Sequence, residues 1–131
     1  MPVSNNQLTL SILPDTLAIC RLSQNATVPD WALTGAFFSM TRTTDELSIV
    51  CNQISVPEDV QCERDWRGLK IEGTLDFSLT GILASLAAPL AEAGISVFAV
   101  STFETDYLLV KASHLENTIK ALSAAGHLIN R

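Results

Sequence analysis

Apolar and polar residues alternate with a period of two in some stretches of the chain and recur at helical spacing in others. Residues 66–72 alternate, which predicts a strand with one face in water. Between residue 78 or 80 and residue 93 the apolar residues recur at helical spacing, which predicts a helix that Gly94 ends. Pro89 lies inside this pattern, so we expect a kink or a local break there.

A hairpin and a second helix are predicted next. Residues 95–101 are β-rich and apolar on both faces, which favours a central, buried strand, and residues 106–112 return as its partner. Residues 113–116, Ser-His-Leu-Glu, have the pattern of a capping box that opens a helix, and Gly126 ends it. Residues 128–129 add a short last strand. The order βαββα(β) is the split βαβ arrangement of the ferredoxin-like fold.

The first half of the chain has similar strands and shorter connections. Residues 8–12 and 16–22 read as two strands separated by a turn at Pro14-Asp15. The crossover that follows, residues 23–35, has room for about one helical turn. Residues 56–60 are likewise only a stub. We therefore expect the helices of the first half to be much shorter than those of the second.

Two segments share one pattern. Residues 37–50 and 97–110 both read as strand, polar turn and strand, at a constant offset of sixty positions. Chance similarity of two hairpins is the alternative, but we favour an internal duplication. The sequence thus predicts an α+β chain of two tandem ferredoxin-like (βαββαβ) modules, residues 1–62 with shortened helices and residues 63–131 with complete ones.

Composition limits the class of protein. The chain has 131 residues, enough for one ordinary domain or two very small fused ones. Its mean hydropathy is +0.28, yet no apolar run reaches the ~20 residues that span a bilayer. The N-terminal residues lack the pattern of a signal peptide. We therefore expect a cytoplasmic protein that does not contact membranes, with its surplus hydrophobicity at an oligomer interface.

Charge and chemistry point away from nucleic acid and from catalysis. The net charge is −6 and no basic cluster is present to neutralise phosphates. Cys20, Cys51 and Cys62 cannot all pair within one chain and none belongs to a CxxC motif, so we expect neither a disulfide scaffold nor a zinc site. No arrangement of Ser, His, Asp or Cys suggests a nucleophile. We expect no catalytic residue, no metal and no cofactor.

Four stretches of the chain resemble the ACT domain, a βαββαβ module that binds small regulatory ligands, usually amino acids. They are Phe37-Phe-Ser-Met-Thr, Trp66-Arg-Gly-Leu-Lys-Ile-Glu-Gly, Leu75-Asp-Phe-Ser-Leu-Thr-Gly-Ile-Leu-Ala and the run from Pro89 to Val110. The chain looks like the compact tandem-ACT family, which includes small bacterial proteins, some named as aspartate-kinase-like, and the cytosolic arginine sensors called CASTOR. The resemblance covers residues 36–110 strongly and the whole chain loosely.

The resemblance implies a ligand held between two ACT modules. Ser96 and Val97 resemble the strand residues whose backbone meets the ligand, and residues 76–81 correspond to the loop at the helix N-terminus. The hairpin turn that contacts the ligand from the opposing module is matched by Thr102, Phe103, Thr105 and Asp106. Because both sets lie in one module here, a complete site requires a second copy, most simply a two-fold homodimer.

Physical chemistry independently favours a small zwitterionic ligand at this place. Free N–H groups at the helix start, near residues 79–81, can hold an α-carboxylate. Asp106 or Asp76 can pair with an ammonium group or a basic side chain. Gly81 would let the ligand and the backbone approach closely.

Each of these residues also has an ordinary structural explanation. Asp76, Ser78 and Thr80 are common helix caps, Asp106 is common in hairpin turns, and Gly81 can serve close helix–strand packing. We therefore expect a non-catalytic regulatory protein that binds an amino acid at an inter-module or dimer interface. The alternative is a structural or oligomerisation protein that has kept the ACT architecture and lost the ligand.

Overall fold

The chain forms two compact units in a computed structural model that describes residues 7–73 and 81–131. Unit 1 comprises Met1–Pro14 with Arg67–Arg131, and unit 2 comprises Asp15–Trp66. Strands β1 (Thr9–Leu22) and β4 (Cys62–Ile71) each contribute to both units. Unit 1 is therefore discontinuous in sequence, whereas unit 2 is one continuous segment inserted into it. The division into modules at residues 62 and 63 stays a prediction about how the chain is built from repeats.

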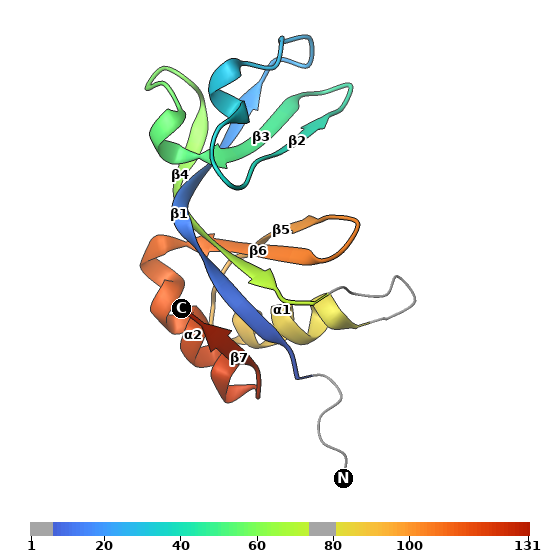
Figure 1. The fold of residues 1–131 in the computed structure, drawn as a ribbon, viewed down its shortest axis with the longest axis vertical. Coiled ribbons are helices and arrows are strands. Elements are labelled where there is room, and N and C mark those ends of the chain that lie inside the picture. Colours follow the sequence, from blue (N-terminus) through green and yellow to red (C-terminus); the bar gives the residue numbers. More distant parts are fainter. Residues whose placement is uncertain (1–6, 74–80) are drawn as a thin grey trace. The chain divides into compact units, whose positions relative to one another are not determined.

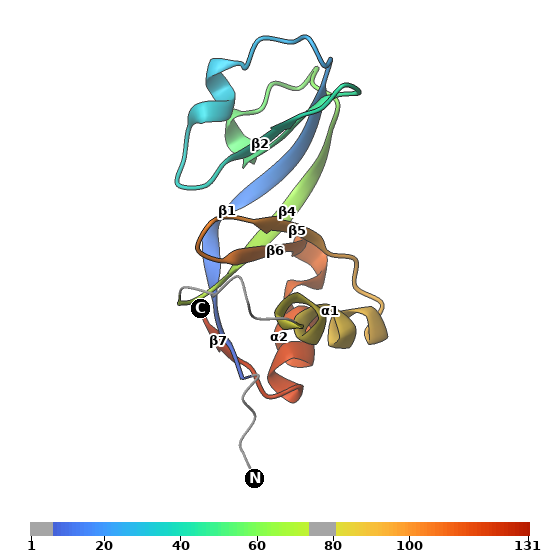
Figure 2. The same ribbon diagram turned by 90° about the vertical axis from the view of Figure 1, so that its right-hand side faces the viewer.

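Unit 1 contains two α-helices, α1 (Ile82–Glu92) and α2 (Leu115–Ala124), which lie on the same face of its strands (Figures 1 and 2). The strands are ordered β7-β1-β4-β6-β5, where β5 is Phe98–Ser101, β6 is Asp106–Lys111 and β7 is Leu128–Asn130. β5 pairs antiparallel with β6, and β7 pairs parallel with β1. The run β4-α1-β5-β6-α2-β7 is the predicted βαββαβ order, and the ferredoxin-like fold is confirmed.

Helices and strands of unit 1 share one core of large aliphatic side chains. Its buried members are Leu10, Leu69, Ile71, Leu86, Leu90, Ile95, Leu108, Val110 and Leu122. Each such side chain stabilises the fold by roughly 1.5–3 kcal/mol when buried. The predicted stop of α1 is confirmed, because Gly94 adopts φ +75° and the Ile95 N–H donates to the Leu90 carbonyl at 2.9 Å.

Unit 2 repeats this strand arrangement around two short 3₁₀ turns, η1 (Asp30–Leu33) and η2 (Gln53–Ser55). Its strands are ordered β2-β3-β1-β4, where β2 is Ser39–Arg42 and β3 is Leu47–Asn52. In each unit the first and third strands of the βαββαβ order are neighbours, with the second strand outside the third. The shortened helices that we predicted for the first half are confirmed.

The two hairpins have the same register. In unit 2 Ser39 pairs with Val50, and in unit 1 Phe98 pairs with Leu109, so equivalent residues are 59 positions apart (98 less 39, and 109 less 50). The offset of sixty read from the sequence is one position too long. When two apolar patterns are matched without knowledge of their pairing, the match can be displaced by one position. The hydrogen bonds between two strands define which residues pair, and so define the offset.

β1 runs unbroken through Pro14 and Asp15, where we predicted a turn between two strands. That prediction was wrong because the fixed φ of proline suits an extended chain, and a strand tolerates it where its missing N–H is not needed. Pro14 and Asp15 instead mark the place where β1 passes from unit 1 to unit 2.

β5 is the outermost strand of unit 1 and is half-buried at alternate residues, so the prediction of a central, buried strand over residues 95–101 was wrong. Part of the apolar run belongs to the link that precedes the strand. Ile95 in this link is 6% exposed and packs in the core. A short apolar run cannot by itself distinguish a buried strand from a buried connection.

One detail of the second predicted helix was wrong, and one alternative for the first helix is excluded. Ser113 forms no capping box, because it lies inside a 3₁₀ turn, η3 (Ala112–His114), and His114 occupies the N-cap position without a side-chain cap bond. α1 continues through Pro89 to Glu92, so the local break does not occur, and the kink that was the other alternative stays a prediction. Only three residues of the helix, less than one turn, follow Pro89.

Candidate functional site

Two glycines flank the connection between β4 and α1 in unit 1. Gly73 adopts φ +89°, and Gly81, the N-cap of α1, adopts φ +78°. Residues that carry a side chain rarely adopt this left-handed backbone conformation, so glycine suits both positions. A Cβ atom at either glycine would meet none of the described atoms within 4 Å. Among the described residues, no close contact requires glycine at position 81, whereas its backbone conformation favours glycine.

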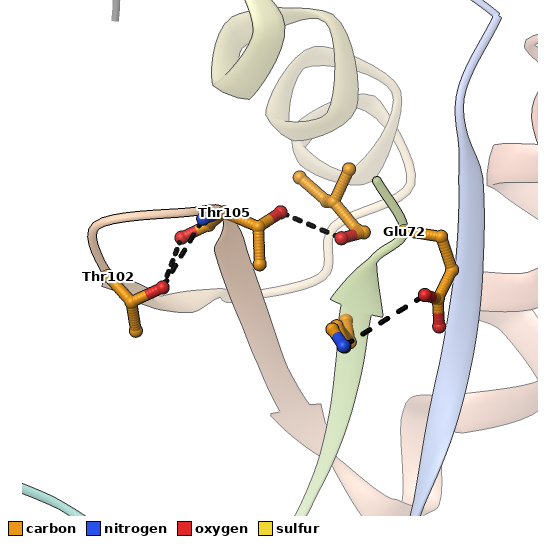
Figure 3. A network of polar contacts seen from close by, with 5 residues as sticks. Glu72, Thr102 and Thr105 are labelled. Atoms are coloured by element: carbon orange, nitrogen blue, oxygen red, sulfur yellow. Dashed lines mark hydrogen bonds and ion pairs between the residues drawn. The ribbon is translucent and has the colours of Figure 1, made fainter. Parts of the chain in front are cut away.

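The turn between β5 and β6 is tied to the end of β4 by Thr105 (Figure 3). The Thr105 side chain is 5% exposed, and its Oγ1 donates to the Ile71 carbonyl at 2.7 Å. Within the turn the Thr102 N–H and Oγ1 donate to the Thr105 carbonyl at 2.8 and 3.0 Å, and the Thr105 N–H donates to Thr102 Oγ1 at 3.3 Å. The turn is thus fixed beside the end of β4, where the connection to α1 begins.

Carboxylates outnumber cations around this end of unit 1. Glu104 is exposed in the turn, and Asp106 is half-buried at the start of β6. Glu72, just after β4, forms an ion pair with Lys70, with 4.0 Å between Nζ and Oε1 (Figure 3). Exposed pairs of this kind are weak, so the local field stays negative. Such a field favours a ligand group that carries positive charge.

The structure does not bring Ser96 and Val97 to this turn. Both precede β5, and the register places Phe98 opposite Leu109 at one end of the hairpin and Ser101 opposite Asp106 at the other. Five residues of extended chain separate Val97 from Thr102, a span of about 17 Å. The two predicted sets of ligand-binding residues therefore lie at opposite ends of β5 within one copy of the chain.

The remaining predicted residues have different outcomes. Asp76, Ser78 and Thr80 lie outside the described residues. Phe103 projects from the turn with 80% of its surface exposed. The tie between Thr105 and β4 was not predicted, since we assigned Thr105 to ligand contact. The threonine at the first position of both hairpin turns, Thr43 and Thr102, was the available signal that these turns have a common structure.

The three cysteines converge in unit 2, although they are far apart in sequence. Cys20 and Cys51 are buried in its core and Cys62 packs against them. A hydrogen bond with Cys51, together with burial, raises the pKa of the Cys20 thiol, and burial raises the pKa of Cys62. These two thiols are therefore held in the protonated form, which is a poor nucleophile.

Two further tests concern the described residues alone. Among residues 7–73 and 81–131, no group of three or more His, Cys, Asp or Glu side chains is arranged to hold a metal ion. None of the helices in this part of the chain is long and apolar enough to cross a membrane.

These features define a small α+β protein of ferredoxin-like topology whose hairpin turn is fixed to the end of a neighbouring strand. The family model for the ACT domain matches residues 61–124, and a second model, of an N-terminal domain, matches residues 15–59. The chain belongs to a family of small ACT-domain proteins.

Known proteins similar to this chain fall into two groups. A crystal structure of a protein from Agrobacterium tumefaciens is 44% identical, with a TM-score of 0.89 over 94% of this chain and 92% of that one. The regulatory subunit of aspartate kinase from Thermus flavus is 12% identical, with a TM-score of 0.62 over 88% of this chain and 95% of that one, and shows the fold alone.

The second group consists of curated relatives. The cytosolic arginine sensor for mTORC1 subunit 1 of Bos taurus is 35% identical over 95 residues, which are 66% of this chain and 29% of the sensor. The chain thus spans less than two thirds of the length of the curated relatives it matches.

Proposed function

We propose that this protein is a non-catalytic regulatory ACT protein that binds a free amino acid. The observation that carries this proposal is the fixed turn: Thr105 holds residues 102–105 against the end of β4. A turn held in this way is preorganised, so little conformational entropy is lost when a small ligand binds against it. The cytosolic arginine sensor among its relatives supports a regulatory role.

The surrounding groups suit both ends of an amino acid. The first N–H groups of α1, after Gly81, have no intrahelical acceptor and lie at the positive end of the helix dipole, so they favour a carboxylate. Asp106, half-buried at the start of β6, can accept hydrogen bonds from an ammonium group. An amino acid carries both a carboxylate and an ammonium group, so it needs a partner of each kind.

In this proposal a second copy of the chain completes the binding site. Ser96 and Val97 lie at the far end of β5 from the turn, so a two-fold dimer is the simplest arrangement that sets them beside the partner's turn. β5 is an outermost strand, and Phe103 offers a large exposed apolar side chain for such a contact. The ligand would then favour one packing of the two copies, with no chemical step.

The test is a thermal shift screen of the purified protein against the twenty L-amino acids, with the mass measured by light scattering. Binding at a hundred times Kd stabilises by about 2.7 kcal/mol, which raises Tm by several degrees in a chain of this size. Asp106→Ala should weaken binding roughly 10- to 100-fold, and Gly81→Trp should weaken it as well. Asp45→Ala, in the equivalent turn of unit 2, is the matched control. Unchanged affinity in both folded site variants would reject the assigned residues.

A second candidate is a structural or oligomerisation protein that has lost its ligand. The observation that favours it is unit 2, where the connections are reduced to 3₁₀ turns of four and three residues. A folded dimer that no amino acid stabilises would support this function over the first.

A further inference from the structure

Arg42 of unit 2 joins the end of β2 to the loop that follows β1. Its guanidinium group donates from Nη1 to the Gln24 carbonyl and from Nη2 to the Ala26 carbonyl, the latter at 2.8 Å. Both carbonyls belong to the loop that leads from β1 to η1. A guanidinium that bridges two acceptors with its planar fork is held more firmly than a single ammonium contact.

The loop that receives Arg42 has its own internal hydrogen bonds. The Ala26 N–H donates to the Ser23 carbonyl at 2.9 Å, and the Asn25 N–H donates to Ser23 Oγ at 3.4 Å. This turn leaves the carbonyls of residues 24 and 26 available to the guanidinium. Oxygen acceptors grouped in this way form a small cation site, which the chain fills with its own side chain.

The position of this contact in the fold corresponds to the proposed ligand site of unit 1. In each unit the loop after the first strand of the βαββαβ order leads to the first helix or 3₁₀ turn. Arg42 ends β2, and the residue 59 positions later, Ser101, ends β5. Ser101 carries no charge and has a side chain only two heavy atoms long. Unit 1 therefore has no cation at the position equivalent to Arg42.

We propose that Arg42 is a built-in occupant of the place in unit 2 that corresponds to the ligand site of unit 1. The chain then offers one amino-acid site per copy, in unit 1, and Arg42 determines which unit is open. This inference rests on the proposed function for its ligand count, whereas the occupancy of the loop by Arg42 is independent of any ligand.

The first test removes the guanidinium and supplies it from solution. Arg42→Ala should lower Tm, and millimolar methylguanidinium should restore several degrees of it. Methylammonium, which lacks the planar fork, should restore less. Arg21→Ala is the matched control, because Arg21 is also exposed and donates to a single carbonyl, that of Asp45, at 3.1 Å. Equal responses of Arg42→Ala, Arg21→Ala and the unchanged chain to methylguanidinium would overturn the proposal.

The second test counts sites by calorimetry, with whichever L-amino acid gives the largest thermal shift. One site per chain is expected for the unchanged protein, and two would overturn the proposal. If no amino acid binds, the proposed function fails, and the rescue by methylguanidinium alone decides whether Arg42 fills a cation site. If Arg42→Ala does not fold, Arg42→Lys replaces it in the first test, because lysine keeps the charge but not the planar fork. Methylguanidinium should restore part of the Tm that Arg42→Lys loses. A Tm that methylguanidinium leaves unchanged would overturn the proposal.

Discussion

The hairpins of the two units agree in their backbone and differ in the side chains of their turns. In each turn a threonine N–H donates to the carbonyl three residues later, from Thr43 at 2.9 Å and from Thr102 at 2.8 Å. The side chains of residues 42–46 and 101–105 differ at four positions, where Arg42, Thr44, Asp45 and Glu46 of unit 2 correspond to Ser101, Phe103, Glu104 and Thr105 of unit 1. Strand pairing preserves the backbone, whereas the residues that would meet a ligand or a partner are free to change.

The core of unit 2 has smaller side chains than that of unit 1, just as its helices are shorter. In unit 1, α1 has 11 residues, and large aliphatic side chains fill the space between it and the strands. In unit 2, η1 has four residues, and the buried cluster includes the small side chains of Ala18, Cys20, Ala32 and Cys51. A short connection supplies few side chains to a core, so smaller residues accompany the loss of a helix.

The largest effect should come from equivalent core positions in the two hairpins. Leu108 of unit 1 and Ile49 of unit 2 are both 0% exposed and 59 positions apart. Each change to alanine should lower the free energy of unfolding by about 2–5 kcal/mol. Leu108→Ala should cost more, because two packed helices limit collapse around its cavity. Urea denaturation measures both, and a larger cost for Ile49→Ala would contradict the comparison of the cores.

The next largest effect on stability should come from Thr105. The equivalent residue of unit 2 is Glu46, so this prediction concerns a hydrogen bond of unit 1. Thr105→Val removes the hydroxyl that donates to the Ile71 carbonyl and should lower the free energy of unfolding by about 1–3 kcal/mol. Thr105→Ser keeps the hydroxyl and is the matched control, with a loss below that of the valine variant. If the two variants are equally stable, the hydrogen bond does not hold the turn. Amino-acid binding should weaken in Thr105→Val more than in Thr105→Ser.

Much of the fold could be predicted from the sequence, because periodic patterns report which face of an element is buried. The helix stops at Gly94 and Gly126 and the short connections of the first half followed from local signals. The unbroken passage of β1 through Pro14 did not, because proline and aspartate are typical of turns and the pairing that keeps the strand extended is long-range. The exposure of β5 was missed for a related reason, since strand order is not written in composition.

The candidate site could be predicted less completely than the fold. The turn at residues 102–106 was identified by resemblance, but its tie to Ile71 depends on contact between segments 34 residues apart in sequence. The contacts of Arg42 with the loop after β1 gave no sequence signal, because an exposed arginine at the end of a strand is ordinary. The convergence of Cys20, Cys51 and Cys62 likewise depends on strand pairing.

A smaller effect should separate the two helix starts. Gly81 precedes α1 with φ +78°, whereas Pro29 precedes η1 with φ −76°. Gly81→Ala places a side chain in the left-handed region and should lower the free energy of unfolding by about 1–2 kcal/mol, although the Cβ meets no described atom. Pro29→Ala should change it by less than about 1 kcal/mol through the unfolded chain. Thermal denaturation checks both, and an unaffected Gly81→Ala would mean that the helix start readily adopts another conformation.

The smallest effect concerns pH, and it tests unit 2 alone because all three cysteines lie there. The pKa values of Cys20 and Cys62 are raised in the folded chain, so their contribution to stability is present below the unfolded-state value of about 8.5 and is lost as pH rises above it. The hydrogen bond from Cys20 lowers the pKa of Cys51, and this thiol contributes in the opposite direction. We expect Tm to fall by only about one to two degrees between pH 7 and pH 9.

Alkylation by iodoacetamide, followed by mass spectrometry, should be slower in the native than in the denatured chain, and Ile49→Ala should accelerate it more than Leu108→Ala. Equal acceleration by the two variants would mean that the units open together, because β1 and β4 run through both.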